Sequence, residues 1–170
     1  MNKENIYELE PSELAKSLEG PSFRATQVLN WVYKKNITDF KEMSNLPKEY
    51  REQLSEKFTV GSFGLLRKEI SSDGSEKYLF GLKDGKTVET VLLKMKEDEY
   101  DEDGKITREA RYTLCISSQV GCKVGCAFCL TAKGGFERNL TAGEIVEQVA
   151  FIKKEKEFGE EKSINIVYMG

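Results

Sequence analysis

The 170-residue chain contains no histidine, and it has only three prolines, one tryptophan and four cysteines. Without histidine, every zinc site of the mixed cysteine–histidine type is excluded. No apolar run approaches the length needed to cross a membrane, and the first residues, MNKENIYELEPSE, lack the apolar stretch of a signal peptide. We therefore expect a cytoplasmic protein without a membrane segment, in a compartment where thiols stay reduced.

The chain also lacks an excess of positive charge. Its net charge is −3, and no long segment is basic, which argues weakly against nucleic-acid binding driven by bulk electrostatics. If the protein binds RNA, local patches have to supply the attraction.

All four cysteines fall in one run, CISSQVGCKVGCAFC, which begins at Cys115. Cys122, Cys126 and Cys129 form a C-x3-C-x2-C pattern, and three thiolates this close repel one another unless a metal or cluster neutralises them. A zinc ribbon normally needs two CxxC pairs, and only Cys126 and Cys129 form one. Iron–sulfur clusters take cysteine thiolates, and three ligands on a four-iron cluster leave one iron open. Four cysteines could form a disulfide framework, but their spacing is too tight for comfortable bridges and no secretion signal is present. A structural metal site remains the alternative from spacing alone.

Hydrophobic periodicity divides the rest of the chain. Helices are expected at 11–19, 22–36 and 47–58, where Ala25, Val28, Leu29 and Val32 form one apolar stripe. Strands are expected at 63–71, 76–82 and 87–94, joined by two Asp-Gly turns into an antiparallel meander. The acidic run 95–110 predicts a solvated, mobile loop.

The last part of the chain predicts one βαβ unit. A strand at 111–118 precedes the cysteine loop, a capping box at Thr141 opens a helix to about Phe158, and 163–169 is expected to be a buried parallel strand. The expected fold class is therefore α/β: a small N-terminal helical bundle (1–60), an antiparallel β meander with its acidic loop (61–110), and the first βαβ unit of a partial barrel (111–170).

The string CISSQVGCKVGCAFCLTAKGGFERNLTAGEI resembles the RlmN-type radical S-adenosylmethionine RNA methyltransferases. FRATQVLNWVYKKNITDFKEMSNLPKEYREQL resembles the N-terminal domain of that family, VETVLL its strand before the barrel, and NIVYMG the strand leading to its Met-Gly-Glu-Pro turn. The resemblance implies formation of 2-methyladenosine in 23S ribosomal RNA and in transfer RNA next to the anticodon.

The resemblance also implies roles for six residues. Cys122, Cys126 and Cys129 would hold a [4Fe–4S] cluster whose open iron binds S-adenosyl-L-methionine, and Phe128 would pack near that cofactor. Glu89 would accept a proton from the target base. Cys115 would be the resolving cysteine that forms a disulfide with a methyl-carrying cysteine. From the residues alone, Glu89 is an ordinary solvent-facing strand position, Phe128 a packing residue and Cys115 a buried thiol.

The resemblance further implies a monomer served by an electron donor such as a flavodoxin or ferredoxin. The methyl-carrying cysteine and the Gly-Glu-Pro turn have no match here, so we expect an N-terminal portion of the enzyme that does not turn over by itself. Two alternatives stay open: a relative that methylates adenine C8, and a non-enzymatic RNA-binding module with a structural four-cysteine metal site.

Overall fold

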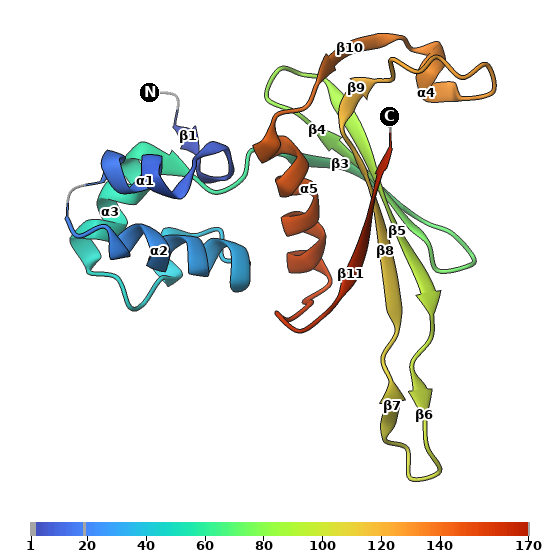
Figure 1. Cartoon of the computed structure of the whole chain (residues 1–170), viewed down its shortest axis with the longest axis horizontal. Coiled ribbons are helices and arrows are strands. Elements are labelled where there is room, and N and C mark those ends of the chain that lie inside the picture. The colour runs from blue at the N-terminus through green and yellow to red at the C-terminus, as the bar shows by residue number, and fades with distance from the viewer. Residues whose placement is uncertain (1–2, 19, 170) are drawn as a thin grey trace. The chain divides into compact units, whose positions relative to one another are not determined.

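The computed structural model describes residues 3–18 and 20–169, and these form two compact units (Figure 1). The helical unit consists of the residues up to 62 together with 141–161. The sheet unit consists of residues 63–140 and 162–169. Across the described residues, no helix is long and apolar enough to cross a membrane.

The helical unit contains the predicted N-terminal bundle. Its longer elements are α1 (Pro11–Ser17), α2 (Phe23–Leu29), α3 (Lys48–Lys57) and α5 (Ala142–Glu155). Shorter elements are β1 (Glu4–Asn5), η1 (Ile6–Glu8), η2 (Asn30–Lys34), η3 (Phe40–Glu42) and β2 (Phe58–Thr59), with β1 and β2 paired in parallel. The predicted stripe forms the core, because Ala25, Val28 and Val32 are buried and Leu29 packs against them.

Three expected helices differ from the structure at their ends. The helix expected at 22–36 changes to π-helical hydrogen bonding at η2, where the Lys35 amide donates to the Asn30 carbonyl at 3.3 Å. The helix expected to reach Phe58 stops at Lys57, and the one expected to reach Phe158 stops at Glu155 because Glu157 adopts a φ of 53°. The expected end of the first helix at residue 19 lies outside the described residues.

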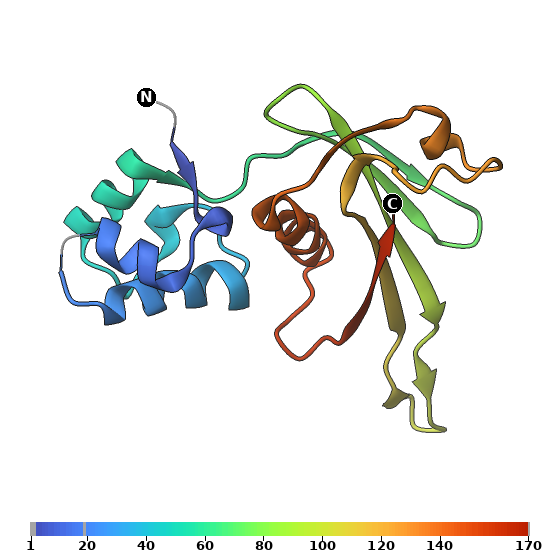
Figure 2. The ribbon, with the colours of Figure 1, turned by 45° about the horizontal axis from the view of Figure 1, so that its top comes forward.

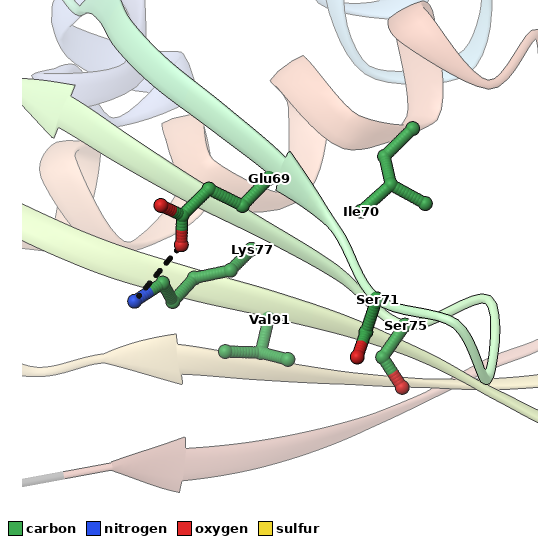
Figure 3. Close-up of a pocket in the computed structure, with 6 residues that line it drawn as sticks. All are labelled: Glu69, Ile70, Ser71, Ser75, Lys77 and Val91. Carbon is green, nitrogen blue, oxygen red and sulfur yellow. Dashed lines mark ion pairs between the residues drawn. The ribbon is translucent and has the colours of Figure 1, made fainter.

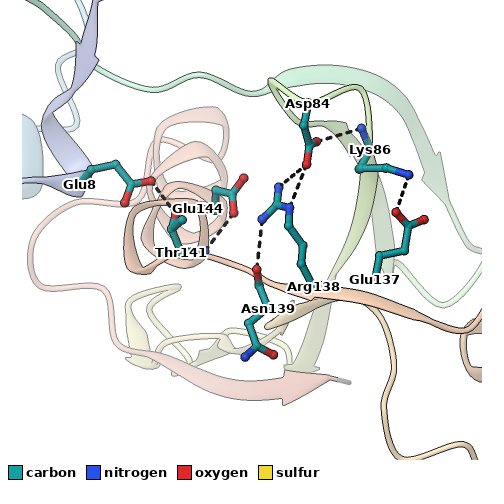
Figure 4. Close-up of polar contacts among 8 residues, drawn as sticks. All are labelled: Glu8, Asp84, Lys86, Glu137, Arg138, Asn139, Thr141 and Glu144. Carbon is teal, nitrogen blue, oxygen red and sulfur yellow. Dashed lines mark hydrogen bonds and ion pairs between the residues drawn. The ribbon is translucent and has the colours of Figure 1, made fainter.

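The capping box at the start of α5 is confirmed. The Thr141 hydroxyl accepts a hydrogen bond from the Glu144 amide at 3.1 Å, and the Glu144 carboxylate accepts one from the Thr141 amide at 2.9 Å (Figure 4). The Thr141 hydroxyl also donates to the Glu8 carboxylate at 2.5 Å, which ties the helix start to η1 within the same unit. Local sequence therefore determines where α5 begins.

The sheet unit contains a five-stranded sheet in the order β11-β8-β5-β4-β3 (Figures 1 and 2). Its strands are β3 (Gly64–Ile70), β4 (Glu76–Gly81), β5 (Thr87–Lys96), β8 (Arg111–Ser117) and β11 (Ile164–Met169). The first three form the predicted antiparallel meander. β8 is antiparallel to β5 and parallel to β11, as the predicted βαβ connection requires. Within the described residues the sheet is open and does not close into a barrel.

Two predictions about this unit are wrong in part. The acidic run is largely exposed, as expected, but it is not a loop throughout. Its strands β6 (Glu99–Tyr100) and β7 (Ile106–Arg108) form a separate two-stranded ribbon, because Asp101 accepts hydrogen bonds from the Asp103 and Lys105 amides and Gly104 takes a φ of 77°. β11 is not buried: Val167 and Tyr168 are exposed. β11 lies at the edge of the described sheet, so only one of its sides has a neighbouring strand.

Candidate functional site

The two residues predicted to act on the target base lie on one face of the sheet. Cys115 of β8 pairs directly with Val91 of β5, and Glu89 precedes Val91 by two positions. Side chains alternate along a strand, so Glu89, Val91 and Cys115 point to the same side. Thr90 and Leu92, which alternate with them on β5, are buried on the opposite side. The register between β5 and β8 therefore brings Glu89 and Cys115 together.

Glu89 has a cationic neighbour that sequence reasoning missed. The Lys77 ammonium of β4 lies 3.3 Å from the Glu89 carboxylate and 3.4 Å from that of Glu69. These two carboxylates, Glu89 first, raise the pKa of Lys77 above its ordinary value. The Ser117 hydroxyl donates to the Glu89 carbonyl at 2.7 Å and so fixes the backbone at this position. The Glu89 carboxylate is thus half-exposed on this face and positioned by the Lys77 ammonium, so a ligand on this face can reach it.

A pocket of about 440 Å³ lies on the same side of the meander, at the end of the β3–β4 hairpin (Figure 3). Its lining consists of Glu69, Ile70, Ser71, Ser75, Lys77 and Val91. Val91 is the cross-strand neighbour of Cys115, so the pocket adjoins the face that carries the two predicted residues.

The cysteine loop begins directly after β8 and has a tight neck. β9 (Gln119–Gly121) pairs antiparallel with β10 (Phe136–Asn139), and the Cys122 amide donates to the Gly135 carbonyl at 3.1 Å. Gly121 has a φ of +75°, and a Cβ there would lie 1.8 Å from the Gly135 oxygen. Only glycine fits this position, because any side chain would collide with backbone.

Residues 122–135 between these strands hold the three clustered cysteines and the short helix α4 (Leu130–Lys133). The thiols of Cys122, Cys126 and Cys129 are free and half-buried. The backbone amide of Ala132, followed by contacts with Thr131, holds the pKa of the Cys129 thiol below its ordinary value. Thiolate is the form that binds metals and clusters, so this environment favours ligation.

The donor set fits an iron–sulfur cluster in its chemistry, with three thiols within eight positions of one loop. Their geometry is not that of an assembled site: in residues 3–18 and 20–169, no three cysteine or acidic side chains are arranged to hold a metal ion. Gly125, between the first two thiols, has a φ of +72°, which favours glycine, and nothing lies within 4 Å of the position that a Cβ would take.

Phe128 lies at the surface of this loop and is 92% exposed. Val124 and Leu130, on the same loop, are also largely exposed. The structure describes no packing partner for Phe128 here, so its predicted position near a cofactor stays a prediction.

Sequence reasoning missed the polar side chains that support the loop. Arg138 lies within the FERN string and Asp84 was interpreted only as a turn residue, yet the Arg138 guanidinium donates to the Asp84 carboxylate at 2.8 Å (Figure 4). The two residues are 54 positions apart, and no local pattern indicates that they meet.

Comparison with known proteins places this geometry in a family. Residues 4–60 match the family model described as the ribosomal RNA large subunit methyltransferase N-terminal domain. The whole chain is 61% identical over 166 residues to the dual-specificity RNA methyltransferase RlmN of Campylobacter concisus, covering 98% of this chain and 43% of the relative. It is 58% identical over 166 residues to the RlmN of a Nitratiruptor species, again over 98% of this chain and 46% of the relative.

The chain corresponds to the N-terminal portion of the RlmN methyltransferases. It spans a little under half the length of these relatives. Among solved structures, a radical SAM methyltransferase from Sphaerobacter thermophilus matches with a TM-score of 0.76 and 34% identity, over 96% of this chain and 45% of that one. The resemblance read from the cysteine motif is thereby confirmed.

Proposed function

We propose that the protein to which this chain belongs is a radical S-adenosylmethionine methyltransferase that forms 2-methyladenosine in 23S ribosomal RNA and in transfer RNA next to the anticodon. The observation that carries the proposal is the common face of Glu89 and Cys115, with a three-thiol loop that follows β8 after the short strand β9. Similarity to RlmN proteins over 98% of the chain supports it.

Each residue then has a stated task. Cys122, Cys126 and Cys129 would hold a [4Fe–4S] cluster, with S-adenosyl-L-methionine and Phe128 beside it. When bound, the cluster and S-adenosyl-L-methionine together supply one-electron cleavage of a carbon–sulfur bond, which opens a radical route to an unreactive ring carbon. Glu89, with Lys77 beside it, would accept the proton lost from the adenine ring.

Cys115 would act last, as the thiol that forms a disulfide with the methyl-carrying cysteine of the longer protein and so frees the RNA. Its place on the same face as Glu89 supports this task, because both residues would then reach one substrate base. The structure records it as a free thiol.

The remaining proposals concern the setting. We propose residues 1–60 as an RNA-contacting domain, supported by the family match at residues 4–60. Residues 61–110 form the β extension, and residues 111–170 begin a radical SAM barrel, as the solved relative supports. We also propose that the protein is a cytoplasmic monomer that receives electrons from a flavodoxin or ferredoxin. Light scattering would test the oligomeric state, and reduction assays would test the electron donor.

Anaerobic reconstitution with iron and sulfide tests the proposal, followed by absorbance and electron paramagnetic resonance with and without S-adenosylmethionine. We expect about four irons per chain and a signal that shifts when the cofactor is added. Cys126→Ser should abolish cluster binding, and the matched variant Cys115→Ser should keep it. Stoichiometric zinc, loss of metal in Cys115→Ser and no response to the cofactor would instead establish a structural four-cysteine site.

The modified position requires the full-length protein. Mass spectrometry of nucleosides from treated RNA should show 2-methyladenosine, and a product methylated at C8 would assign the protein to the C8-directed relatives.

A further inference from the structure

The neck of the cysteine loop is attached to a turn that is distant in sequence. The turn between β4 and β5 carries Asp84 and Lys86, and β10 carries Glu137 and Arg138 (Figure 4). The Asp84 carboxylate accepts hydrogen bonds from Arg138 Nε at 2.8 Å and lies 2.8 Å from its Nη2. Lys86 forms an ion pair with Glu137. We name these four residues the turn clamp.

The turn holds its charges in place by its own backbone. Asp84 Oδ1 accepts the Lys86 amide at 3.0 Å, and Gly85 adopts a φ of +81°. The Lys86 amide, and after it Arg138, hold the pKa of the Asp84 carboxyl below its ordinary value. Glu137 raises the pKa of Lys86. Asp84 thus shapes the hairpin with one oxygen and binds Arg138 with the other.

The order of charges specifies a register. Asp84 faces Arg138, and Lys86 faces Glu137. A slip of β10 by one residue in either direction would set Asp84 against Glu137, or Lys86 against Arg138, and like charges repel. The clamp therefore favours one alignment of β10 over its nearest alternatives.

Register matters here because β10 is irregular. Phe136 pairs with Gly121 and Arg138 with Val120, so Glu137 is an extra residue without a partner on β9. Strand register is weakly specified in polar or glycine-rich strands. β9 has three residues, of which Gln119 is polar and Gly121 is glycine, and β10 is largely polar. The bulged residue is the one that Lys86 binds.

The attachment continues into the cysteine loop. Arg138 Nη1 donates to the Asn139 carbonyl at 3.1 Å, and Gln119 Nε2 donates to the Asn139 side chain at 2.9 Å. Gln119 Oε1 in turn accepts the Lys123 amide at 3.1 Å, directly after Cys122. A continuous series of polar contacts thus joins the turn to the backbone that carries the first thiol.

We propose that the turn clamp is a positioning element for the cysteine loop: Asp84 and Lys86 set the register of β10 against β9 and so hold closed the neck at Cys122, from which the loop with all three thiols extends. This inference rests on the proposed function for the ligation of a cluster by these thiols. Half-exposed ion pairs contribute little to global stability. The expected signature is therefore a local one, with faster opening of the neck and little change in melting temperature.

A charge swap of Lys86 and Glu137 tests the clamp in the metal-free protein. The variants Lys86→Glu and Glu137→Lys each place like charges together, and we expect amide hydrogen exchange at Cys122 and Lys123 to accelerate about three- to tenfold. The double variant restores the attraction between residues 86 and 137 and should return exchange at least half-way to the wild-type rate. It makes both turn residues acidic and both strand residues basic, so it does not restore the alternation of charge that opposes a one-residue slip. A merely structural loss would not be repaired by the swap.

The control is Arg108→Glu, which breaks the Arg108–Glu99 pair on the β6–β7 ribbon. Its side chains are 51% and 50% exposed, close to the 46% and 47% of Lys86 and Glu137. The ribbon lies at the opposite end of the sheet from the cysteine loop (Figure 1). Exchange at Cys122 should not change in this variant. The clamp proposal is overturned if both single variants exchange at the wild-type rate. It is also overturned if exchange in the double variant is no slower than in the single variants.

The reconstituted protein supplies a second measurement. Iron release to a chelator should be about threefold faster or more in each single variant, and slower in the double variant than in either single variant. Failure of the wild type to take up iron and sulfide would overturn the proposed function, while the exchange experiment would still decide on the clamp. Cluster uptake by the wild type with unchanged release in the single variants would overturn the clamp alone.

Discussion

A buried carboxylate on α5 offers the sharpest test of how the helical unit is held together. Glu147 is 5% exposed and accepts hydrogen bonds from Asn5 Nδ2 at 3.0 Å, from the Ser62 hydroxyl at 3.0 Å and from the Ser62 amide. Asn5 in turn accepts the Gly61 amide at 3.0 Å. One side chain thus joins the start of the chain, the end of the N-terminal segment and a helix far along the sequence.

Replacing Glu147 with glutamine keeps the shape and removes an acceptor. One carboxylate oxygen accepts the Ser62 amide and the other accepts Asn5, so either orientation of the new amide sets a donor against a donor. A hydrogen bond to a charged group contributes about 1.5–3 kcal/mol, and a buried donor left unsatisfied costs a similar amount. We expect Glu147→Gln to lower the free energy of unfolding of the helical unit by about 2–4 kcal/mol.

Trp31 makes this unit measurable by itself, because it is the only tryptophan of the chain and lies in the helical unit. Urea unfolding followed by its fluorescence should show a midpoint lowered by about 1 M or more, with an unchanged slope. The control is Glu56→Gln on α3, an exposed carboxylate in the same unit. If the two variants unfold at the same urea concentration, the Glu147 network does not hold the unit together and the reasoning is refuted.

Three further predictions follow from single contacts. Gly121→Ala should open the neck of the cysteine loop, because its Cβ would collide with the Gly135 carbonyl. The rate of amide exchange at Cys122 should rise at least tenfold, which corresponds to a free energy of opening lowered by about 1.4 kcal/mol. An unchanged rate would contradict the close approach. Asp84 should titrate below its ordinary pKa. Its contribution to stability is therefore complete above about pH 4 and is lost as the pH falls through the lowered pKa. Arg138→Gln should raise the midpoint of the Asp84 titration measured by NMR, and an unmoved midpoint would exclude the ion pair. Thr141→Ala should lower the free energy of unfolding of the helical unit by about 1 kcal/mol, because it removes the cap of α5. Urea unfolding followed by Trp31 fluorescence measures the loss, and Thr141→Ser should restore most of it.

Local patterns were sufficient for most elements. The apolar spacing around Val28 predicted a buried helical face, and the two Asp-Gly turns predicted the meander. Thr141 and Glu144 predicted the start of α5. These succeeded because the interactions that define a helix cap, a tight turn or an amphipathic face lie within a few residues of one another.

The acidic run shows where composition misleads. Its charges predicted a solvated, mobile loop, whereas Asp101 and Gly104 build a turn that pairs β6 with β7. Charge explains why the segment is exposed to solvent, and the hydrogen bonds of the turn decide its backbone. The dipeptide Asp103-Gly104 is a turn signal that the net charge of the run does not remove.

The amino-acid sequence alone was enough to predict which reactive groups the chain carries: three thiols at cluster spacing, a fourth on the strand before them, and a carboxylate in the VET motif. The folded structure was needed to show that Glu89 and Cys115 share a face, that Lys77 lies beside Glu89, and that Asp84 binds Arg138. Residue types and short spacings can be read directly from the sequence. Which side chains meet across strands depends on how distant segments align, because a shift of one residue reverses every face.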